Sequence, residues 1–177
     1  MKRIGSMNQA ELGAFVQAHL LKRGIDVVLS GGALVALYTS GRYVSRDLDL
    51  VNRYFSKRTD IRHAMEELGF QETERHFKHP ETEYFIEFPP GPLSLGEDIN
   101  IRVEEIAVET GVLRALSPTD CVKDRLAWYY HYGDRQCLDQ AVLVTRHHRI
   151  DMKELRRWSE AEGKLREFEI ARTQMAR

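Results

Sequence analysis

Two aspartates, Asp47 and Asp49, alternate with leucines in the segment 47–51 (DLDLV). Side chains of a β-strand point alternately to opposite faces, so both carboxylates are expected on one face, about 6.6 Å apart along the backbone. Two like charges at that distance repel by roughly 2 to 3 kcal/mol at an effective dielectric near 20. A hard, oxygen-bound cation such as Mg²⁺ removes this cost. The pair therefore predicts a metal site, although a strand with one wet face shows the same pattern.

A glycine pair, Gly31 and Gly32, follows the apolar segment 27–29 and Ser30. Glycine allows the backbone to approach a ligand closely. The helix predicted over 33–38 would point its free N–H groups and its positive dipole end toward an anion. This unit therefore predicts a phosphate site next to the metal site, although two glycines after a strand also make an ordinary turn.

A Gly-Gly turn after a strand, a short helix and an Asp-x-Asp strand resemble the signature of the DNA polymerase β-like nucleotidyltransferase superfamily, in its minimal and abortive-infection branches. Gly31, Gly32, Asp47 and Asp49 match this signature residue by residue. Residues 33–46 separate the glycines from the aspartates, which predicts an extended connection before the second strand.

The resemblance implies a third carboxylate on a later strand, and Glu87 in the segment 84–88 (YFIEF) is the candidate. The family more often has Asp at that place. The proline-rich segment 89–92 would end the strand and place Glu87 near a rim, because proline denies the sheet a hydrogen bond. An alternating strand with one outward Glu explains the same residue.

The family's mechanism implies that Asp47 and Asp49 hold two Mg²⁺ or Mn²⁺ ions and that Glu87 completes one site and helps to deprotonate an attacking hydroxyl. The Ser30-Gly31-Gly32 turn would cradle the triphosphate. The implied activity is transfer of a nucleoside monophosphate from a nucleoside triphosphate to an acceptor, which is left open among RNA such as tRNA, a protein hydroxyl and a small molecule.

The same branches imply a toxin–antitoxin or phage-defence setting, and a partner protein or a second copy of the chain is left open. Because the third acid is Glu rather than Asp, a second hypothesis stands beside the enzyme. The chain would then be a catalytically silent relative that binds a nucleotide or a partner protein.

Three cations are predicted to bind the nucleotide, namely Arg46, Lys123 and Arg135. With Arg125 and Asp139, the two later ones bear a looser resemblance to the Lys-rich helix and the Arg-Asp-x-x-Asp pattern of the abortive-infection enzymes. A lysine would supply a point charge to a phosphate and an arginine a planar fork. A solvated helix face with ion pairs explains the same residues.

The periodicity predicts an α+β fold, with a mixed sheet flanked by helices over 1–116 and a C-terminal helical part over 117–177 packed on this core. Ser117, Pro118 and Asp120 predict a helix start with a capping box. The expected strands are 27–29, 47–51, 70–77, 84–88, 99–103, 105–110 and 112–116; the expected helices are 8–23, 33–38, one with its apolar stripe over 61–68, 118–132, 135–148 and 152–163, before a charged tail that packs back on the domain.

Composition sets outer limits on function. With 177 residues, 42% hydrophobic and 30% charged, the chain is expected to form one soluble domain or a domain with a helical extension. A formal net charge of −1 gives no general attraction to nucleic acid, so a polynucleotide would need a local basic patch. Cys121 and Cys137 are too few for a disulfide framework and are expected to be buried. With no signal peptide or membrane span in the sequence, the expected location is the cytoplasm.

Overall fold

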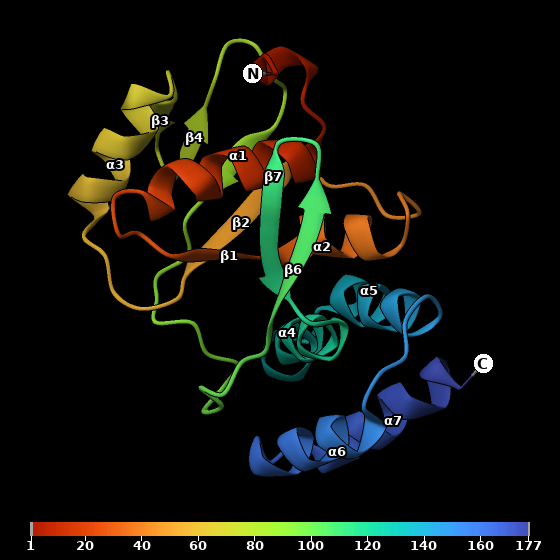
Figure 1. The fold of residues 1–177 in the computed structure, drawn as a ribbon. Helices are drawn as coiled ribbons and strands as arrows, with labels where there is room; N and C mark the ends of the chain where they lie inside the picture. Colours follow the sequence, from red (N-terminus) through yellow and green to blue (C-terminus); the bar gives the residue numbers. More distant parts are fainter. Residues whose placement is uncertain (1, 177) are drawn as a thin grey trace.

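The protein, described over residues 2–176 in a computed structural model, is built on a seven-stranded mixed sheet (Figure 1). The strands lie in the order β3-β4-β5-β2-β1-β7-β6. They are β1 (Val27–Ser30), β2 (Asp47–Asn52), β3 (Gln71–Thr73), β4 (His76–Lys78), β5 (Phe85–Glu87), β6 (Val103–Val108) and β7 (Gly111–Leu116). The helices are η1 (Ile4–Ser6), α1 (Gln9–Leu21), α2 (Gly31–Tyr38), α3 (Arg58–Glu67), α4 (Pro118–Tyr132), α5 (Arg135–Thr145), α6 (Met152–Ala161) and α7 (Leu165–Met175).

Both strand directions meet at the centre of the sheet. Strand β1 is antiparallel to β2 but parallel to β7, and β2 is parallel to β5. The registers place Ser30 and Glu87 on either side of Asp49. The predicted α+β fold with a mixed sheet is confirmed.

The two faces of β2 differ in polarity. Leu48 and Leu50 are fully buried, whereas Asp47 and Asp49 are partly exposed. Helix α1 crosses the leucine face of the sheet (Figure 1), where a Cβ built on Gly13 would lie 3.2 Å from Leu48 Cδ2. Burial of the leucines against α1 therefore fixes the face on which the aspartates stand.

Helix α1 begins where its sequence predicts. The Asn8 side chain accepts a hydrogen bond from the Glu11 N–H, and the Glu11 carboxylate accepts one from the Asn8 N–H, which completes a capping box. Further along, residues 39–46 form an irregular connection between α2 and β2. The extended connection expected before the aspartates is confirmed.

The strand expected over 70–77 is wrong as a single element. The chain turns at Glu74 and Arg75, where Glu74 has a φ of 57°, and so divides the segment into β3 and β4. These strands pair with each other, and β4 pairs antiparallel with β5. Two adjacent charged side chains disfavour a strand interior and allow this turn.

The strand expected over 99–103 is also absent, and β6 is one strand rather than part of two. The stretch before it closes on itself, because Leu95 and Asp98 exchange backbone hydrogen bonds of 2.9 and 3.2 Å. The Asp98 side chain then accepts from the Asn100 N–H at 3.0 Å. Local bonding of this kind competes with pairing in a sheet.

Helix α4 starts at Pro118 with Ser117 as its N-cap, as predicted. The capping box is only half formed, because the Asp120 carboxylate accepts from the Arg102 N–H at 3.0 Å instead of from the N–H of Ser117. The Ser117 N–H donates to the Arg102 carbonyl at 3.0 Å. A tertiary contact thus replaces the local one.

The C-terminal segment packs back on the domain, as expected, and it does so as the two helices α6 and α7. Leu155, Trp158 and Phe168 are buried, and the Trp158 indole N–H donates to the Leu95 carbonyl at 2.9 Å. Helix α5 ends at Thr145, short of the predicted end, because the following residues form turns. The division of the chain into two domains at residue 116 stays a prediction.

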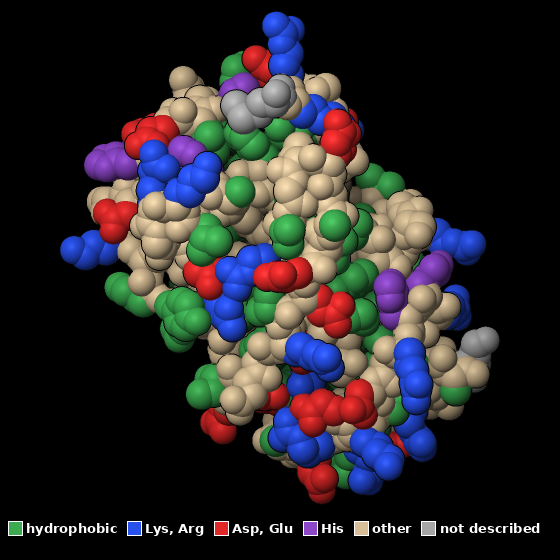
Figure 2. Space-filling view, in the orientation of Figure 1, with side chains coloured by type: hydrophobic (Ala, Val, Ile, Leu, Met, Phe, Trp, Pro, Cys, Tyr) green, Lys and Arg blue, Asp and Glu red, His purple; other side chains and the backbone are tan. Residues whose placement is uncertain are grey.

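Both cysteines are buried and unpaired with each other, as expected. Within residues 2–176, no helix is long and apolar enough to cross a membrane. On the face drawn in Figure 2, Lys and Arg side chains are interspersed with Asp and Glu rather than gathered into one basic surface.

Candidate active site

The glycine turn and the aspartate strand are in direct contact. Gly31 has a φ of +70°, and a Cβ built on it would overlap Asp49 Oδ2. The Ser30 hydroxyl lies 3.4 Å from the backbone carbonyl of Asp49. Glycine is therefore required at position 31 for its conformation and for the close approach of the carboxylate.

The neighbouring glycine is under weaker constraint. A Cβ on Gly32 would lie 3.1 Å from Ser45 Oγ and 3.3 Å from Tyr43 Cε1, and its φ is not in the left-handed region. The two predicted turn glycines thus have different contacts. Gly31 brings the backbone against Asp49, and Gly32 packs against Tyr43 and Ser45 of the connection that precedes β2. The Ser45 hydroxyl in that connection donates to Asp47 Oδ1.

Asp49 is the carboxylate whose surroundings most strongly oppose its charge among the described residues. Burial, followed by the charge of Asp47, raises the pKa of Asp49 to about 7; Asp124 and Glu87 act in the same direction, and the guanidinium of Arg125 opposes them. Four carboxylates therefore influence one another beside a single cation. A divalent cation is the usual means of relieving such crowding.

Glu87 lies beside Asp49 on the neighbouring strand, since the two are register partners in the parallel pair of β2 and β5. Its carboxylate is paired with His76 Nε2, and His76 is its antiparallel partner on β4. The structure thus brings Glu87 to the predicted place in the sheet but engages its charge with an imidazole. Its role as third carboxylate stays a prediction.

Two further residues reach this site from α4: Asp124, which was not predicted, and Arg125, which the looser resemblance included without giving it a role. Asp124 Oδ2 accepts a hydrogen bond from the Gly31 N–H at 3.2 Å and from Arg125 Nη2 at 2.7 Å. Burial lowers the pKa of Arg125, but the charge of Asp124 and the hydrogen bond to it, with smaller contributions from Cys137 and Cys121, together raise the pKa above its usual range. A signal was present: this Asp-Arg pair lies between Val122 and Leu126, both fully buried.

A hollow of about 610 Å³ opens at Asp49. Its walls come from Ser30, which precedes the glycines, from β2 and β5, from β3 and the turn that follows it, from the start of α3, and from α4. Asp49, Glu87, Asp124 and Arg125 give it charged groups, and Trp128 is among its apolar ones. The volume is in the range of pockets that hold small ligands.

Lys123 lies elsewhere. Its side chain is only 2% exposed, and its ammonium group pairs with Asp98 at 3.2 Å, Asp120 at 3.2 Å and Glu154 at 2.7 Å. It lines a different hollow from that of Asp49. The structure does not bring Lys123 to the aspartate pair.

The two other predicted cations are at the surface. Arg46, immediately before β2, is exposed and lies 3.6 Å from the Glu83 carboxylate. Arg135 is exposed at the first position of α5. Neither lines the hollow at Asp49.

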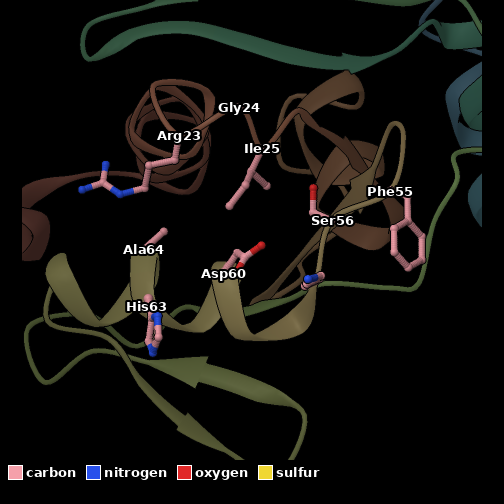
Figure 3. A pocket seen from close by; sticks show the side chains of 9 residues that line it. Arg23, Gly24, Ile25, Phe55, Ser56, Asp60, His63 and Ala64 are labelled. Carbon is pink, nitrogen blue, oxygen red and sulfur yellow. The ribbon is translucent and has the colours of Figure 1, made fainter.

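A second hollow, of about 510 Å³, lies between the end of α1 and the start of α3 (Figure 3). Asp60 is the one carboxylate in its lining, and Figure 3 shows Arg23 and His63 directed away from it. Since its charged groups do not converge, this hollow offers less chemistry than the one at Asp49.

Asp47 and Asp49 are the groups that fit a cofactor. Across residues 2–176, no three His, Cys, Asp or Glu side chains converge closely enough to form a metal-binding cluster. The two aspartates nevertheless offer only oxygen ligands from one strand face, and the raised pKa of Asp49 reports a need for positive charge. The pair therefore fits a hard divalent cation.

No protein-family model matches the sequence, and no curated protein is significantly similar to it. Among solved structures, the crystal structure of an antigenic nucleotidyltransferase-like protein from Paracoccidioides brasiliensis aligns with a TM-score of 0.58 and 15% identity, over 78% of this chain and 76% of that one. The solution structure of the antibiotic-resistance factor ANT(2'')-Ia aligns with a TM-score of 0.51 and 14% identity, over 92% and 90%. The chain therefore has the α+β fold of these nucleotidyltransferase structures, with a seven-stranded mixed sheet and C-terminal helices.

Proposed function

We propose that the protein is a metal-dependent nucleotidyltransferase, which moves a nucleoside monophosphate from a nucleoside triphosphate to a hydroxyl acceptor. One observation carries the proposal. Asp47 and Asp49 stand on one face of β2, Asp49 lines a ligand-sized hollow, and burial and neighbouring carboxylates raise the pKa of Asp49 to about 7. A bound divalent metal would relieve the repulsion between these carboxylates and so stabilise the protein. The likeness in fold to two nucleotidyltransferase structures supports nucleotidyl transfer as the reaction that such a metal would serve.

Asp47 and Asp49 would hold Mg²⁺ or Mn²⁺. When bound, the ions stabilise charge on the attacking and leaving oxygens of an in-line displacement at the α-phosphorus. The chain's own part is to fix the ligands beforehand. Gly31 confines the Asp49 carboxylate, and the Ser45 hydroxyl holds Asp47. Preorganised ligands need little rearrangement when the reaction occurs.

Glu87 is proposed to accept the proton of the acceptor hydroxyl and to complete the metal ligands. Its position opposite Asp49 on β5 supports this role. His76 holds the Glu87 carboxylate in the structure, so the proposed role requires that the pair open as substrate and metal bind. After the products leave, the His76 imidazole would pair with the Glu87 carboxylate again and stabilise it until the next substrate binds.

The phosphates are proposed to lie at the Ser30-Gly31-Gly32 turn and the start of α2, where backbone N–H groups favour an anion. The Asp124 carboxylate now accepts the Gly31 N–H, so a phosphate would take its place. Arg125 lines the same hollow and would remain as a counter-charge. The exposed residues Arg46 and Arg135 are proposed to contact the distal phosphates, as flexible side chains at the edge of the site.

The acceptor is part of the proposal only as a class, a hydroxyl of RNA, of a protein or of a small molecule. A toxin–antitoxin or phage-defence setting, with a partner protein or a second copy of the chain, follows from the sequence resemblance alone. Growth arrest on expression, and its relief by a co-expressed neighbour gene, would test that setting.

The test is incubation of the purified protein with labelled ATP, GTP, CTP and UTP in Mg²⁺ or Mn²⁺, with total RNA and protein extracts as acceptors. Label should pass to one class of acceptor with release of pyrophosphate. Asp47→Asn/Asp49→Asn should abolish the transfer. Transfer that survives in this variant would refute the proposed site.

A second function is favoured by one specific observation. Glu87, the group expected to take the proton of the acceptor hydroxyl, is engaged within the protein by His76. A protein that only binds a nucleotide would tolerate this arrangement. Calorimetry showing metal-dependent nucleotide binding, with no transfer to any extract, would select this alternative.

A further inference from the structure

Two aromatic side chains on α4 are exposed next to each other. Trp128 is 47% and Tyr132 75% exposed, and their ring centroids lie 5.0 Å apart with an interplanar angle of 34°. The remaining face of the indole is therefore available to a ligand, while the neighbouring Tyr130 is buried and stacks on Trp158. Exposed aromatic rings are frequent at binding surfaces because they offer large contact areas with little entropy cost.

Trp128 belongs to the hollow that contains Asp49. It lies three and four residues after Arg125 and Asp124 on α4, and residues at this spacing share a helix face. Trp128 stands about 6 Å along the helix axis from Asp124, whose carboxylate accepts the Gly31 N–H. The indole and the proposed phosphate position therefore both lie near this turn of α4.

The hollow also has an apolar lining from a second element. Phe88, Pro89 and Pro90 follow β5 directly and line the same space. Prolines have fixed backbone angles, so this wall is rigid. A flat apolar ring would find contacts on both the α4 side and the β5 side.

We propose that Trp128 is the stacking platform for the base of the nucleoside triphosphate. This inference rests on the proposed function and adds a residue that sets how the nucleotide is held. The occupant follows from the charges beside the indole, since Arg125 and the Gly31 N–H suit a phosphate on the same molecule as the ring. Stacking accepts every base, because each has a π-face. The site is therefore expected to discriminate weakly among the four nucleotides.

Intrinsic fluorescence isolates the platform, because the chain has two tryptophans and Trp158 is only 1% exposed. ATP, GTP, CTP and UTP in Mg²⁺ should each change the emission of Trp128, whereas inorganic tripolyphosphate should bind without changing it. Trp128→Ala should weaken nucleotide binding roughly 5- to 150-fold in calorimetry and leave tripolyphosphate binding unchanged. Trp128→Phe should restore most of the affinity.

Phe55→Ala is the matched control, since Phe55 is 81% exposed but lines only other hollows than that of Asp49. It should leave the affinity unchanged. Equal nucleotide affinity in wild type and Trp128→Ala would overturn the platform while the proposed function stands. Conversely, failure of label transfer, with the Trp128 effect on nucleotide binding intact, would overturn only the proposed function.

A short single-stranded oligonucleotide distinguishes the other source of a base. If the oligonucleotide changes the Trp128 emission and a saturating nucleoside triphosphate does not displace it, the platform serves the acceptor instead. That result would overturn the assignment to the triphosphate. Displacement of the oligonucleotide by the triphosphate would support it.

Discussion

Two groups of carboxylates lie on different sides of α4 and have opposite electrostatics. In the first, which we call the lysine cluster, Lys123 pairs with Asp98, Asp120 and Glu154. Arg157 adds a second cation, with ion pairs to Glu154 and Asp98. Positive charge thus lies within the group.

The second group, which we call the acidic site, consists of Asp47, Asp49, Glu87 and Asp124. The guanidinium next to this group, that of Arg125, forms an ion pair with Asp124, and the Glu87 carboxylate pairs with the His76 imidazole. Asp47 and Asp49 have no such cationic partner among the contacts of the described residues. The acidic site thus lacks the central cation that the lysine cluster has.

The pKa values express this difference. Hydrogen bonds from Arg157, and then from Lys123, lower the pKa of Glu154 to about 2. Burial and the charge of Asp47 raise the pKa of Asp49 to about 7. The lysine cluster therefore stabilises the fold by its charges, whereas the acidic site costs stability when its crowded carboxylates are ionised. A carboxylate group that the chain leaves uncompensated is a candidate for function.

The largest expected effect comes from removing the charges of the acidic site. Asp47→Asn/Asp49→Asn should lower the rate of nucleotidyl transfer at least about 10³-fold, because metal ligation contributes several kcal/mol to the transition state. The variant should also lose the rise in thermal stability that Mg²⁺ gives the wild type. Label-transfer rates and unfolding curves with and without Mg²⁺ measure both effects. Asp60→Asn, which changes the carboxylate of the second hollow, should leave both unchanged.

The next largest effect tests the lysine cluster. Lys123→Ala should lower the free energy of unfolding by about 3 to 5 kcal/mol, because three carboxylates lose their shared cation in a buried place. Urea unfolding measures the loss, and Lys123→Met, which keeps much of the side-chain volume, should show a similar one. The folded variant should keep its ratio of triphosphate to monophosphate affinity. A selective loss of triphosphate affinity at unchanged stability would instead show that Lys123 binds the phosphates, as the sequence predicts.

The aspartate strand and glycine turn could be predicted from the sequence because their information is local. Alternation with buried leucines fixes the face of Asp47 and Asp49, and a glycine with positive φ fixes the turn. The partners of Lys123 could not be predicted, since Asp98 and Glu154 come from distant segments that only the packing of α6 brings together.

The same reason explains why other contacts of the acidic site could not be predicted from the sequence. Asp124 reaches Gly31 across 93 residues of chain, so its place between two buried residues of α4 marked it as unusual but did not identify Gly31 as its partner. The engagement of Glu87 by His76 depends on the division of 70–77 into β3 and β4. The turn at Glu74 and Arg75 sets where β4 begins, and this register is what places His76 opposite Glu87.

A smaller effect concerns pH. Because the pKa of Asp49 is raised, the native protein binds this proton more tightly than the unfolded chain, whose Asp titrates near pH 4. The stabilising contribution of the protonated group is therefore complete below about pH 4 and is lost as the pH rises to about 7. Asp49→Asn does not titrate, so without metal its stability should exceed that of the wild type by roughly 2 to 4 kcal/mol above pH 7 and by little at pH 4.

Urea unfolding in chelator at pH 4.5, 6 and 8 would measure this difference. Mg²⁺ should close most of the gap at pH 8 and little of it at pH 4.5, since protons compete with the metal for Asp49. The stability of Asp47→Asn should depend on pH less than that of the wild type, because the loss of the Asp47 charge brings the pKa of Asp49 closer to its usual value. Some pH dependence should remain, because burial still raises that pKa. A difference between wild type and Asp49→Asn that stays constant with pH would contradict the raised pKa.

The smallest effect concerns the two glycines of the turn that lies against the acidic site. Gly31→Ala should cost about 1 to 3 kcal/mol of stability, because it places a side chain in a left-handed conformation and against Asp49 Oδ2. Gly32→Ala should change stability by less than about 1 kcal/mol, since alanine favours the helix and its Cβ meets only side chains, Ser45 Oγ at 3.1 Å and Tyr43 Cε1 at 3.3 Å. A double-mutant cycle separates the causes: Gly31→Ala should cost less in an Asp49→Ala background, where the carboxylate is absent. Equal costs in the two backgrounds would show that the conformation of Gly31, and not the close approach of Asp49, explains the glycine.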